Sequence, residues 1–216
     1  MIRKEKEKLS NYLFLKDEFP YKNKWFKVLI LKTYLTKDII INLVDIFENI
    51  FGDIAYTVTD NEIIIIYFDE IDFSLEEVLL SVSDDFGINI LGFSMPKIYA
   101  NNNNFLEIYE LYKKYIFNKH QGYFTISDLI LEAMVEYNDI KILKAIVLDK
   151  VLSNPQNETL ILAMFKNDLN ILKTSKKIYM HRNTINNRLD LIKRESDLNI
   201  QKFQDAVAIY NMLKLK

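Results

Sequence analysis

The chain has 216 residues, of which half are hydrophobic and 13% aromatic, so it is not intrinsically disordered and can form one or two packed domains. The absence of cysteine excludes disulfides and thiolate metal sites. Apolar runs such as Ile63–Phe68 are far shorter than the ~20 residues that span a bilayer. Residues 1–8 carry both signs of charge, and no apolar signal segment follows them. We therefore expect a soluble cytoplasmic protein without a membrane partner.

The net charge of −2 conceals an uneven distribution along the chain. Residues 159–216 carry eleven Lys and Arg against five acidic residues, whereas residues 1–158 carry 17 against 25. A basic C-terminal part on an acidic body indicates a polyanionic partner, although many basic surfaces are simply solvated.

The first half of the chain alternates between strand-like and helix-like periodicity. Residues 1–24 are expected to form a helix or arm. Farther along, Asp60-Asn61 predicts a tight hairpin turn, and Ser74 with Glu77 predicts a capping box. The resulting order is β-α-β-β-α-β, which predicts an α+β fold of the ferredoxin type, with a four-stranded antiparallel sheet and helices on one face. Strands are expected over 26–34, 54–59, 62–68 and 88–94, and the two helices over 38–51 and from 74 to about 86.

Helical patterns dominate from residue 105 onward. A helix is expected over Phe105–Asn118, and residues 121–153 are interpreted as a helical connector that follows a first domain over 25–120. Asn154 suits an N-cap and Pro155 suits the first helical position, so a domain border is expected at this point. Residues 154–216 are predicted to form an all-α domain with helices over 155–167, 170–179, 182–195 and 202–215.

The second and third helices of this domain have the pattern of a helix-turn-helix. Each has an apolar stripe, and only Tyr179-Met180-His181 separates the two. The small side chain of Ser175 allows the helices to approach closely. The expected inward residues are Ile171, Ser175 and Ile178 in the second helix, Ile185, Leu189 and Ile192 in the third, and Phe203, Ala206, Val207, Tyr210 and Leu213 in the last.

The outer surface of the third helix is rich in side chains that can read DNA bases. Arginine can bond guanine bidentately, and asparagine can do the same for adenine. Residues 170–194 carry seven basic residues and one acid, which supplies attraction to phosphates. The pattern alone is also compatible with a helical interaction bundle. The outward residues are Arg182, Asn183, Asn186, Asn187, Asp190 and Arg194.

The run from Lys176 to Ile192 resembles the C-terminal helix-turn-helix of the PucR/CdaR family of bacterial transcriptional regulators. The element His181-Arg182-Asn183-Thr184, followed by Arg188-Leu189, carries the resemblance, and Glu158-Thr159-Leu160 is similar to the start of that domain. The pair Thr174-Ser175 stands where the family often has two small residues. The resemblance implies sequence-specific binding of double-stranded DNA, with helix 182–195 in the major groove. The expected base contacts are His181, Arg182, Asn183, Asn186 and Asn187, and the expected phosphate contacts are Ser175, Lys176, Lys177, Thr184 and Arg188.

The same resemblance implies a degenerate GGDEF-like domain over residues 25–120. A cyclase of this type has a Gly-Gly-Asp/Glu-Glu-Phe turn, but the turn here is Thr59-Asp60-Asn61-Glu62, and the first strand contains no acid. Without a paired-carboxylate magnesium site, phosphoryl transfer has no electrostatic support. We therefore expect no enzymatic activity, with Asp60 and Glu62 as ordinary turn residues.

No metal or cofactor is expected either. Asp69, Glu70 and Asp72 lack the glycine of an EF-hand loop and are interpreted as a solvated loop. The two histidines, His120 and His181, have no cysteine partners, and His181 is expected to face DNA or to cap the third helix in its neutral form.

The expected partners are DNA, a second copy of the chain and a small-molecule effector. A single helix-turn-helix reads only a few base pairs, which favours a homodimer or higher homo-oligomer. The alternative is a protein-interaction adaptor or ligand sensor that keeps the fold without binding DNA. Retention of Arg182, Asn183, Thr184 and Arg188 favours DNA binding over this alternative.

Overall fold

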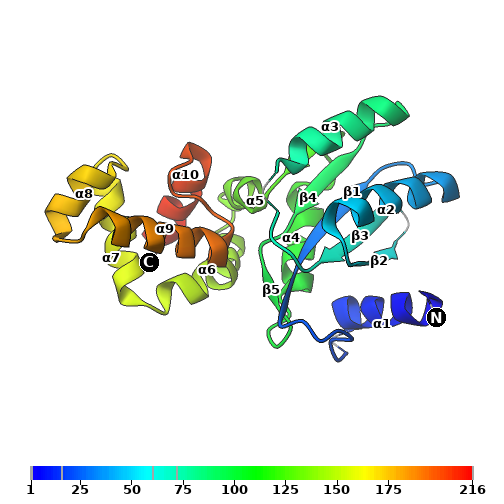
Figure 1. Ribbon diagram of the computed structural model, residues 1–216, viewed down its shortest axis with the longest axis horizontal. Helices are drawn as coiled ribbons and strands as arrows, with labels where there is room; N and C mark the ends of the chain where they lie inside the picture. Colours follow the sequence, from blue (N-terminus) through cyan, green and yellow to red (C-terminus); the bar gives the residue numbers. More distant parts are fainter. Residues whose placement is uncertain (1, 16, 60, 72, 216) are drawn as a thin grey trace. The chain divides into compact units, whose positions relative to one another are not determined.

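The computed structural model describes residues 2–15, 17–59, 61–71 and 73–215, with side chains from Lys8 onward. The predicted turn residue Asp60 and the predicted loop residue Asp72 lie outside the described residues. The chain divides into two compact units, Met1–Thr125 and Ile126–Lys216 (Figure 1). Within the described ranges, no helix is both long enough and apolar enough to cross a membrane.

The first unit is built on a twisted sheet with the strand order β2-β3-β1-β4-β6. The central strand β1 pairs antiparallel with both β3 and β4, β6 pairs parallel with β4, and β5 pairs with the start of β1. The chain order β1-α2-β2-β3-α3-β4 is the predicted one, and the α+β class is confirmed. The bounds are β1 Trp25–Lys32, α2 Lys37–Phe51, β2 Ile54–Val58, β3 Glu62–Tyr67, α3 Leu75–Phe86, β4 Leu91–Ser94, β5 Ile98–Tyr99 and β6 Gly122–Phe124.

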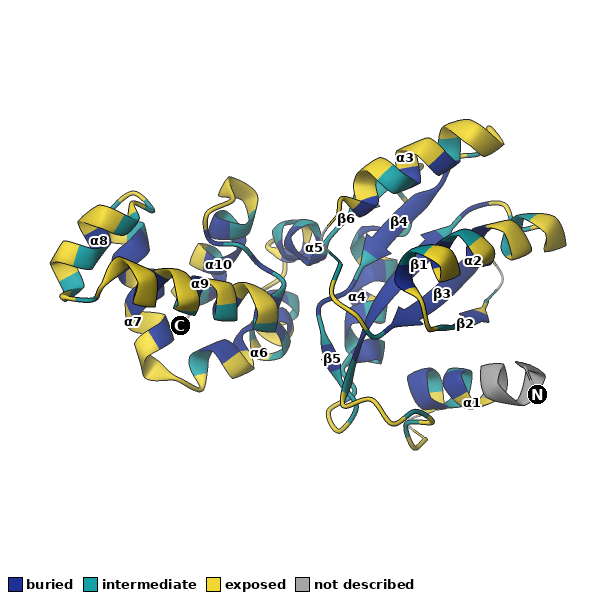
Figure 2. Cartoon of the chain, in the orientation of Figure 1, coloured by how far each residue is buried: buried dark blue, intermediate teal, exposed yellow. Residues whose placement is uncertain are grey.

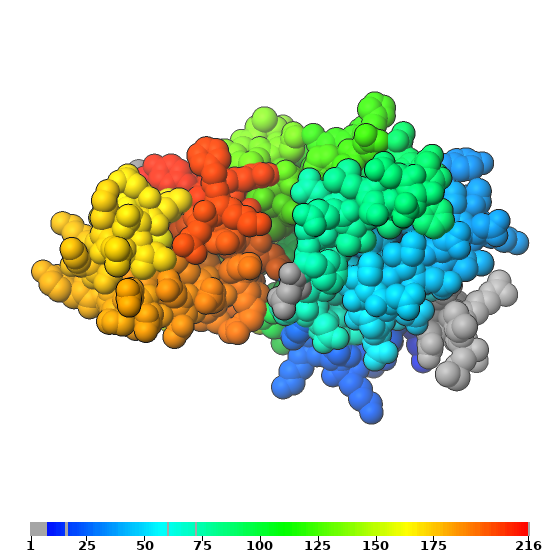
Figure 3. Space-filling model, turned by 45° about the horizontal axis from the view of Figure 1, so that its top comes forward, coloured from blue at the N-terminus to red at the C-terminus, as the bar shows by residue number. Residues whose placement is uncertain are grey.

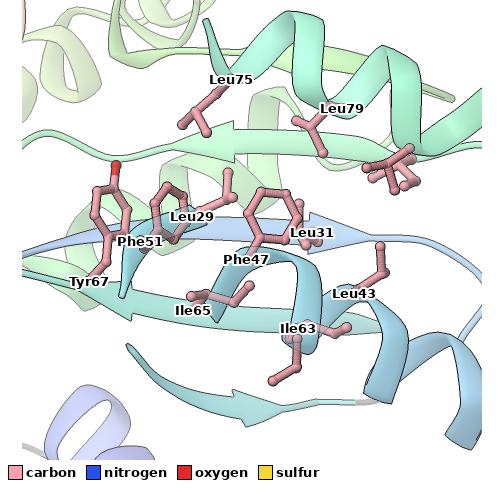
Figure 4. Close-up of a cluster of buried hydrophobic side chains, with 13 residues drawn as sticks. Leu29, Leu31, Leu43, Phe47, Phe51, Ile63, Ile65, Tyr67, Leu75 and Leu79 are labelled. Carbon is pink, nitrogen blue, oxygen red and sulfur yellow. The ribbon is translucent and has the colours of Figure 1, made fainter. Parts of the chain in front are cut away.

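One face of this sheet packs against α2 and α3. Alternate residues of β1 and β3 point to the same side, where they meet the apolar stripes of the two helices (Figure 4). Phe51 of α2 stacks on Tyr67 of β3 with ring centroids 4.1 Å apart. The predicted cap of α3 is present, because the Ser74 side chain accepts a hydrogen bond from the Glu77 amide. The core on this side contains Leu29, Leu31, Leu43, Phe47, Phe51, Ile63, Ile65, Tyr67, Leu75 and Leu79.

The opposite face is also covered by helices, whereas helices were expected on one face only. Here α1 (Ile2–Leu15) and α4 (Phe105–Tyr115) provide the cover. Tyr12 meets Phe26 of β1, and Tyr112 stacks on Phe93 of β4 with centroids 4.9 Å apart. All six residues of β3 are buried (Figure 2). A continuous apolar strand is typical of a sheet covered on both sides, so the run from Ile63 already indicated this arrangement.

Glu62 is a buried strand residue, and its prediction as a turn residue was wrong. Its carboxylate accepts hydrogen bonds from Tyr109 Oη at 2.6 Å, Tyr112 Oη at 2.7 Å and Lys113 Nζ at 3.2 Å. Burial, together with the Glu62 charge, raises the pKa of Tyr112 well above its ordinary value. These bonds tie α4 to the start of β3.

Glu70 is an ion-pair partner and not only a solvated loop residue. It accepts from Lys27 and from Lys97, each at 2.9 Å, and both lysine side chains are nearly buried. Partial burial raises the pKa of Glu70, but the hydrogen bonds from Lys97 and Lys27 outweigh it and bring the pKa below its ordinary value. Two ion pairs therefore hold the loop after β3 against the sheet.

The second unit consists of six helices in the described part of the chain. The segment 121–153, which was expected to be a connector, divides between the units: β6 joins the sheet, while α5 and α6 pack with the helix-turn-helix. A domain of about 60 residues buries little apolar surface alone, and α6 contributes buried Leu143, Val147 and Val151. The bounds are α5 Ile126–Ala133, α6 Tyr137–Leu152, α7 Pro155–Lys166, α8 Ile171–Ile178, α9 Arg182–Ser196 and α10 Phe203–Lys214.

Candidate nucleic-acid interface

The start of the predicted DNA-binding region has the expected local structure. Asn154 caps α7, its side-chain oxygen accepting from the Gln156 amide at 3.0 Å, and Pro155 is the first helical residue. Asn170 caps α8 in the same way through the Lys173 amide at 2.9 Å. These caps fix where α7 and α8 begin, so the short α8 is positioned by its own sequence.

The two sides of α9 differ sharply in burial. Ile185, Leu189 and Ile192 are buried, as predicted, at 0%, 6% and 1% exposure. The opposite side is exposed along the helix (Figure 2), and the segment around residues 170–190 lies at the surface of the second unit (Figure 3). Within the described part of the chain, the exposed side chains of α9's first two turns have no hydrogen-bond or ion-pair partner; these are Arg182, Asn183, Thr184, Asn186 and Asn187.

His181 is the N-cap of α9. Its Nδ1 accepts a hydrogen bond from the Asn183 amide at 3.2 Å, which requires an unprotonated Nδ1. The capping part of the prediction is therefore confirmed, and the ring remains exposed at the end of the helix. A ring fixed in this way presents its other nitrogen to the surroundings.

The basic residues of α8 fall into two groups. Lys173 pairs with Asp168 at 3.1 Å. Lys176 and Lys177 are exposed, and the described residues offer neither of them a partner. Their charges are therefore available to an external anion.

The most buried residue of α8 is Thr174, at 0% exposure, whereas the predicted inward residue Ser175 is only half-buried. Thr174 Oγ1 has no hydrogen-bond partner within the described structure. An orphan hydroxyl in a packed interior costs free energy that an apolar group of the same size does not.

We expect Thr174→Val to stabilise the second unit by about 1 kcal/mol, because it exchanges the unbonded hydroxyl for a methyl group of similar volume. Chemical denaturation followed by circular dichroism would measure the gain. The matched control is Thr184→Val, at an exposed position, where a change within about 0.5 kcal/mol is expected. A loss of stability in Thr174→Val would show that the hydroxyl is bonded in solution.

Arg188, one of the predicted phosphate contacts, also has partners inside the second unit. Its guanidinium donates to Asn157 Oδ1 at 3.2 Å and to Gln156 Oε1, and the side chain is half-buried. The buried Asn157 in turn donates to the Val151 carbonyl at 2.9 Å. Arg188 lies on the flank of α9 next to the buried stripe, so it reaches the start of α7 and connects α9 to α6 through Asn157.

The last helix, α10, is rotated from the prediction. Ala206 is buried as expected, but Phe203 is 83% exposed and Tyr210 is 43% exposed, with its ring edge-on to Phe165. The buried stripe of α10 repeats at intervals of three residues and includes alanines, whose small side chains allow close packing. The bulky aromatic residues lie outside this stripe. It comprises Ala206, Ile209 and Met212, together with Ala208.

A family model described as the PucR C-terminal helix-turn-helix domain matches residues 158–215, which run from the first turn of α7 to the end of α10. Residues 158–215 are a PucR-type helix-turn-helix domain. The PucR-type domain places the chain among transcriptional regulators and implies DNA as its partner. The recognition made from His181-Arg182-Asn183-Thr184 is thus confirmed.

Similarity to a solved structure is weaker than the PucR-type match. The crystal structure of a regulator of polyketide synthase expression from Bifidobacterium adolescentis is similar over 91% of this chain and 82% of that chain, with 11% sequence identity and a TM-score of 0.43. No curated protein matches the sequence.

Sequence reasoning gave no role to Tyr179, which lies in the turn between α8 and α9 of the PucR-type domain. It is 96% exposed and has a left-handed backbone with φ of 53°. Such a conformation costs a side-chain-bearing residue roughly 1 kcal/mol relative to glycine. The sequence sign of this exposed position was a bulky aromatic residue inside a three-residue turn.

The described residues show no metal centre in either unit. No group of three or more His, Asp or Glu side chains within them is placed to hold a metal ion.

Proposed function

We propose that this chain is a sequence-specific DNA-binding transcriptional regulator of the PucR/CdaR type, with α9 in the major groove. The observation that carries the proposal is the exposed face of α9. The residues of the PucR-type match include the helix pair α8 and α9. The buried stripe of α9 packs in the core of the second unit, while the exposed side chains of its first two turns have no partner among the described residues. Side chains without internal partners can bond base edges without losing internal bonds.

The proposed base contacts lie in the first two turns of α9. Arg182 and Asn186 are one turn apart on one flank, and Asn183 and Asn187 form the adjacent row. All four can make bidentate contacts, and the N-terminal end of a recognition helix is the part that reaches base edges. His181 stands at this end with its ring exposed and completes the proposed set.

Phosphate contacts are proposed for the cationic and hydroxyl side chains around this helix. Lys176 and Lys177 carry unpaired charge among the described residues, and Thr184 and Ser175 provide hydroxyl groups. Arg188 is instead proposed to position α9, because Gln156 and Asn157 already hold its guanidinium. Contacts of the lysine and hydroxyl side chains with the DNA phosphates fix the register of α9 in the groove.

The test is a titration of the full chain against a random duplex and a duplex selected from genomic fragments, from ~50 to ~200 mM salt. Binding to random DNA is expected to fall steeply with salt, and the selected site is expected to bind at least ~10³-fold more tightly. Two chains per site are expected, because one helix-turn-helix reads only a few base pairs. Absence of salt-dependent binding would favour the adaptor alternative.

The first unit is proposed to be a degenerate GGDEF-like regulatory domain. Its β-α-β-β-α-β order supports this, and Glu62, the first residue of β3 after the hairpin turn, has its carboxylate occupied by Tyr109, Tyr112 and Lys113. A carboxylate held in this way is not available as a magnesium ligand, which supports a regulatory and not a catalytic role.

A cavity of about 360 Å³ in the first unit is the proposed site of a small-molecule effector. Its size lies within the usual range of ligand sites. Apolar Leu79, Leu80 and Ile90 line it together with the polar Asn89 and Gln121. Gly122, at the start of β6, also lines it, and the chain continues from β6 directly into α5 of the second unit.

A further inference from the structure

Tyr179 combines backbone strain with nearly complete exposure. It ends α8 in the left-handed conformation, with its amide donating to the Ser175 carbonyl. Glycine occupies this conformation without a steric penalty, whereas a residue with a Cβ does not. The phenol ring is 96% exposed and has no ring or hydrogen-bond partner among the described residues. The ring therefore contributes nothing to the packing of the second unit that offsets the backbone conformation.

The surroundings of Tyr179 are cationic. Lys176 and Lys177 lie in the turn of helix before it, and Arg182 begins α9 three residues after it. All three are exposed and unpaired within the described part of the chain, and the nearest acid along the chain that follows is Asp190. Phe203, another exposed aromatic residue of this unit, follows only one exposed lysine, Lys202.

We propose that Tyr179 is a DNA backbone contact, its phenolic O–H donating to a phosphate oxygen at the edge of the groove that α9 enters. This inference rests on the proposed function. In a helix-turn-helix the first helix crosses the backbone and the start of the second reaches the bases, so the turn between them lies over phosphates. A phosphate oxygen accepts hydrogen bonds, and a phenol supplies a donor without adding charge.

The neutral donor gives the contact a distinct signature. A lysine that contacts phosphate releases a counterion, and its loss lowers the salt slope of binding, whereas the loss of a hydroxyl leaves that slope unchanged. Because phosphates are common to all sequences, the loss is expected to be equal on selected and random duplexes.

The experiment compares Tyr179→Phe, Tyr179→Gly and Lys177→Ala in the full chain, on both duplexes, from ~50 to ~200 mM salt. Tyr179→Phe is expected to weaken binding about three- to tenfold on both duplexes at every salt concentration, the range for one hydrogen bond. Tyr179→Gly should weaken binding at least as much while raising the melting temperature by about 2–4 °C. Lys177→Ala should instead lower the salt slope by about one.

The control is Tyr34→Phe, at an 80% exposed tyrosine of the first unit, which should leave binding unchanged. If the wild-type chain does not bind duplex DNA, the proposed function and this inference both fall. If the wild type binds and Tyr179→Phe binds equally well, only the inference about Tyr179 is overturned. A loss confined to the selected duplex would overturn it too, because Tyr179 would then read bases.

Discussion

Arg182→Ala is expected to lower affinity for the selected site by roughly 5- to 150-fold, which corresponds to the ~1–3 kcal/mol of one bidentate base contact. Affinity for random DNA should stay nearly constant. Arg182 is the first residue of α9, exposed and unpaired among the described residues, so its removal should leave the fold intact. Fluorescence anisotropy on the selected and random duplexes, with a melting curve of each protein, would measure both effects.

Lys177→Ala is the matched comparison for Arg182→Ala, because it removes one exposed cation from the neighbouring helix. Lys177→Ala should weaken binding to the selected and the random duplex by the same factor. If Arg182→Ala also lost affinity for both in equal proportion, the face of α9 assigned to base reading would be wrong. If neither variant changed binding, the helix-turn-helix would not be the DNA-reading element.

Glu62→Ala is expected to destabilise the first unit by about 3–5 kcal/mol, the usual cost of removing one partner of a buried charged group. The substitution leaves the hydroxyls of Tyr109 and Tyr112 and the amine of Lys113 without their shared acceptor. Urea denaturation followed by the fluorescence of Trp25, the single tryptophan, reports on this unit because Trp25 begins β1.

Two further variants make the result specific to the buried cluster. Glu62→Gln keeps an acceptor oxygen without the charge, so its stability in urea should lie between those of the wild type and Glu62→Ala. Glu76→Ala removes an exposed acid from α3 and should change stability by no more than about 0.5 kcal/mol. If Glu62→Ala lowered the free energy of unfolding by less than about 1 kcal/mol, water would be replacing the carboxylate as acceptor for the surrounding donors, and the prediction would be wrong.

Features that depend on local spacing could be predicted from the sequence. The caps at Ser74 and Asn154, the buried stripe of Ile185, Leu189 and Ile192, and the strand order along the chain follow from residues within one or two turns of each other. Hydrogen-bond chemistry and helical periodicity determine such features locally, so no knowledge of the rest of the molecule is needed.

Features that depend on distant partners could not be predicted. Arg188 bonds Asn157, 31 residues away, and Glu62 bonds Tyr112, 50 residues away. An arginine on a helix flank or an acid beside a turn gives no local sign of such a partner. The exposed Phe203 shows the same limit, because the rotation of α10 is set by the surfaces on which Ala206 and Ile209 pack.

The separation of the two sides of α9 has a consequence for how this protein can change over evolution. The residues proposed to choose the DNA sequence are distinct from those that hold the domain together, since Ile185, Leu189 and Ile192 are buried and Arg188 is anchored to α7. Exchanges at the four exposed positions Arg182, Asn183, Asn186 and Asn187 leave the core and the anchor untouched. Target preference can therefore diverge between descendants of one ancestral gene while the scaffold remains constant, and a library randomised at these positions can be screened for new sites without a loss of folded protein.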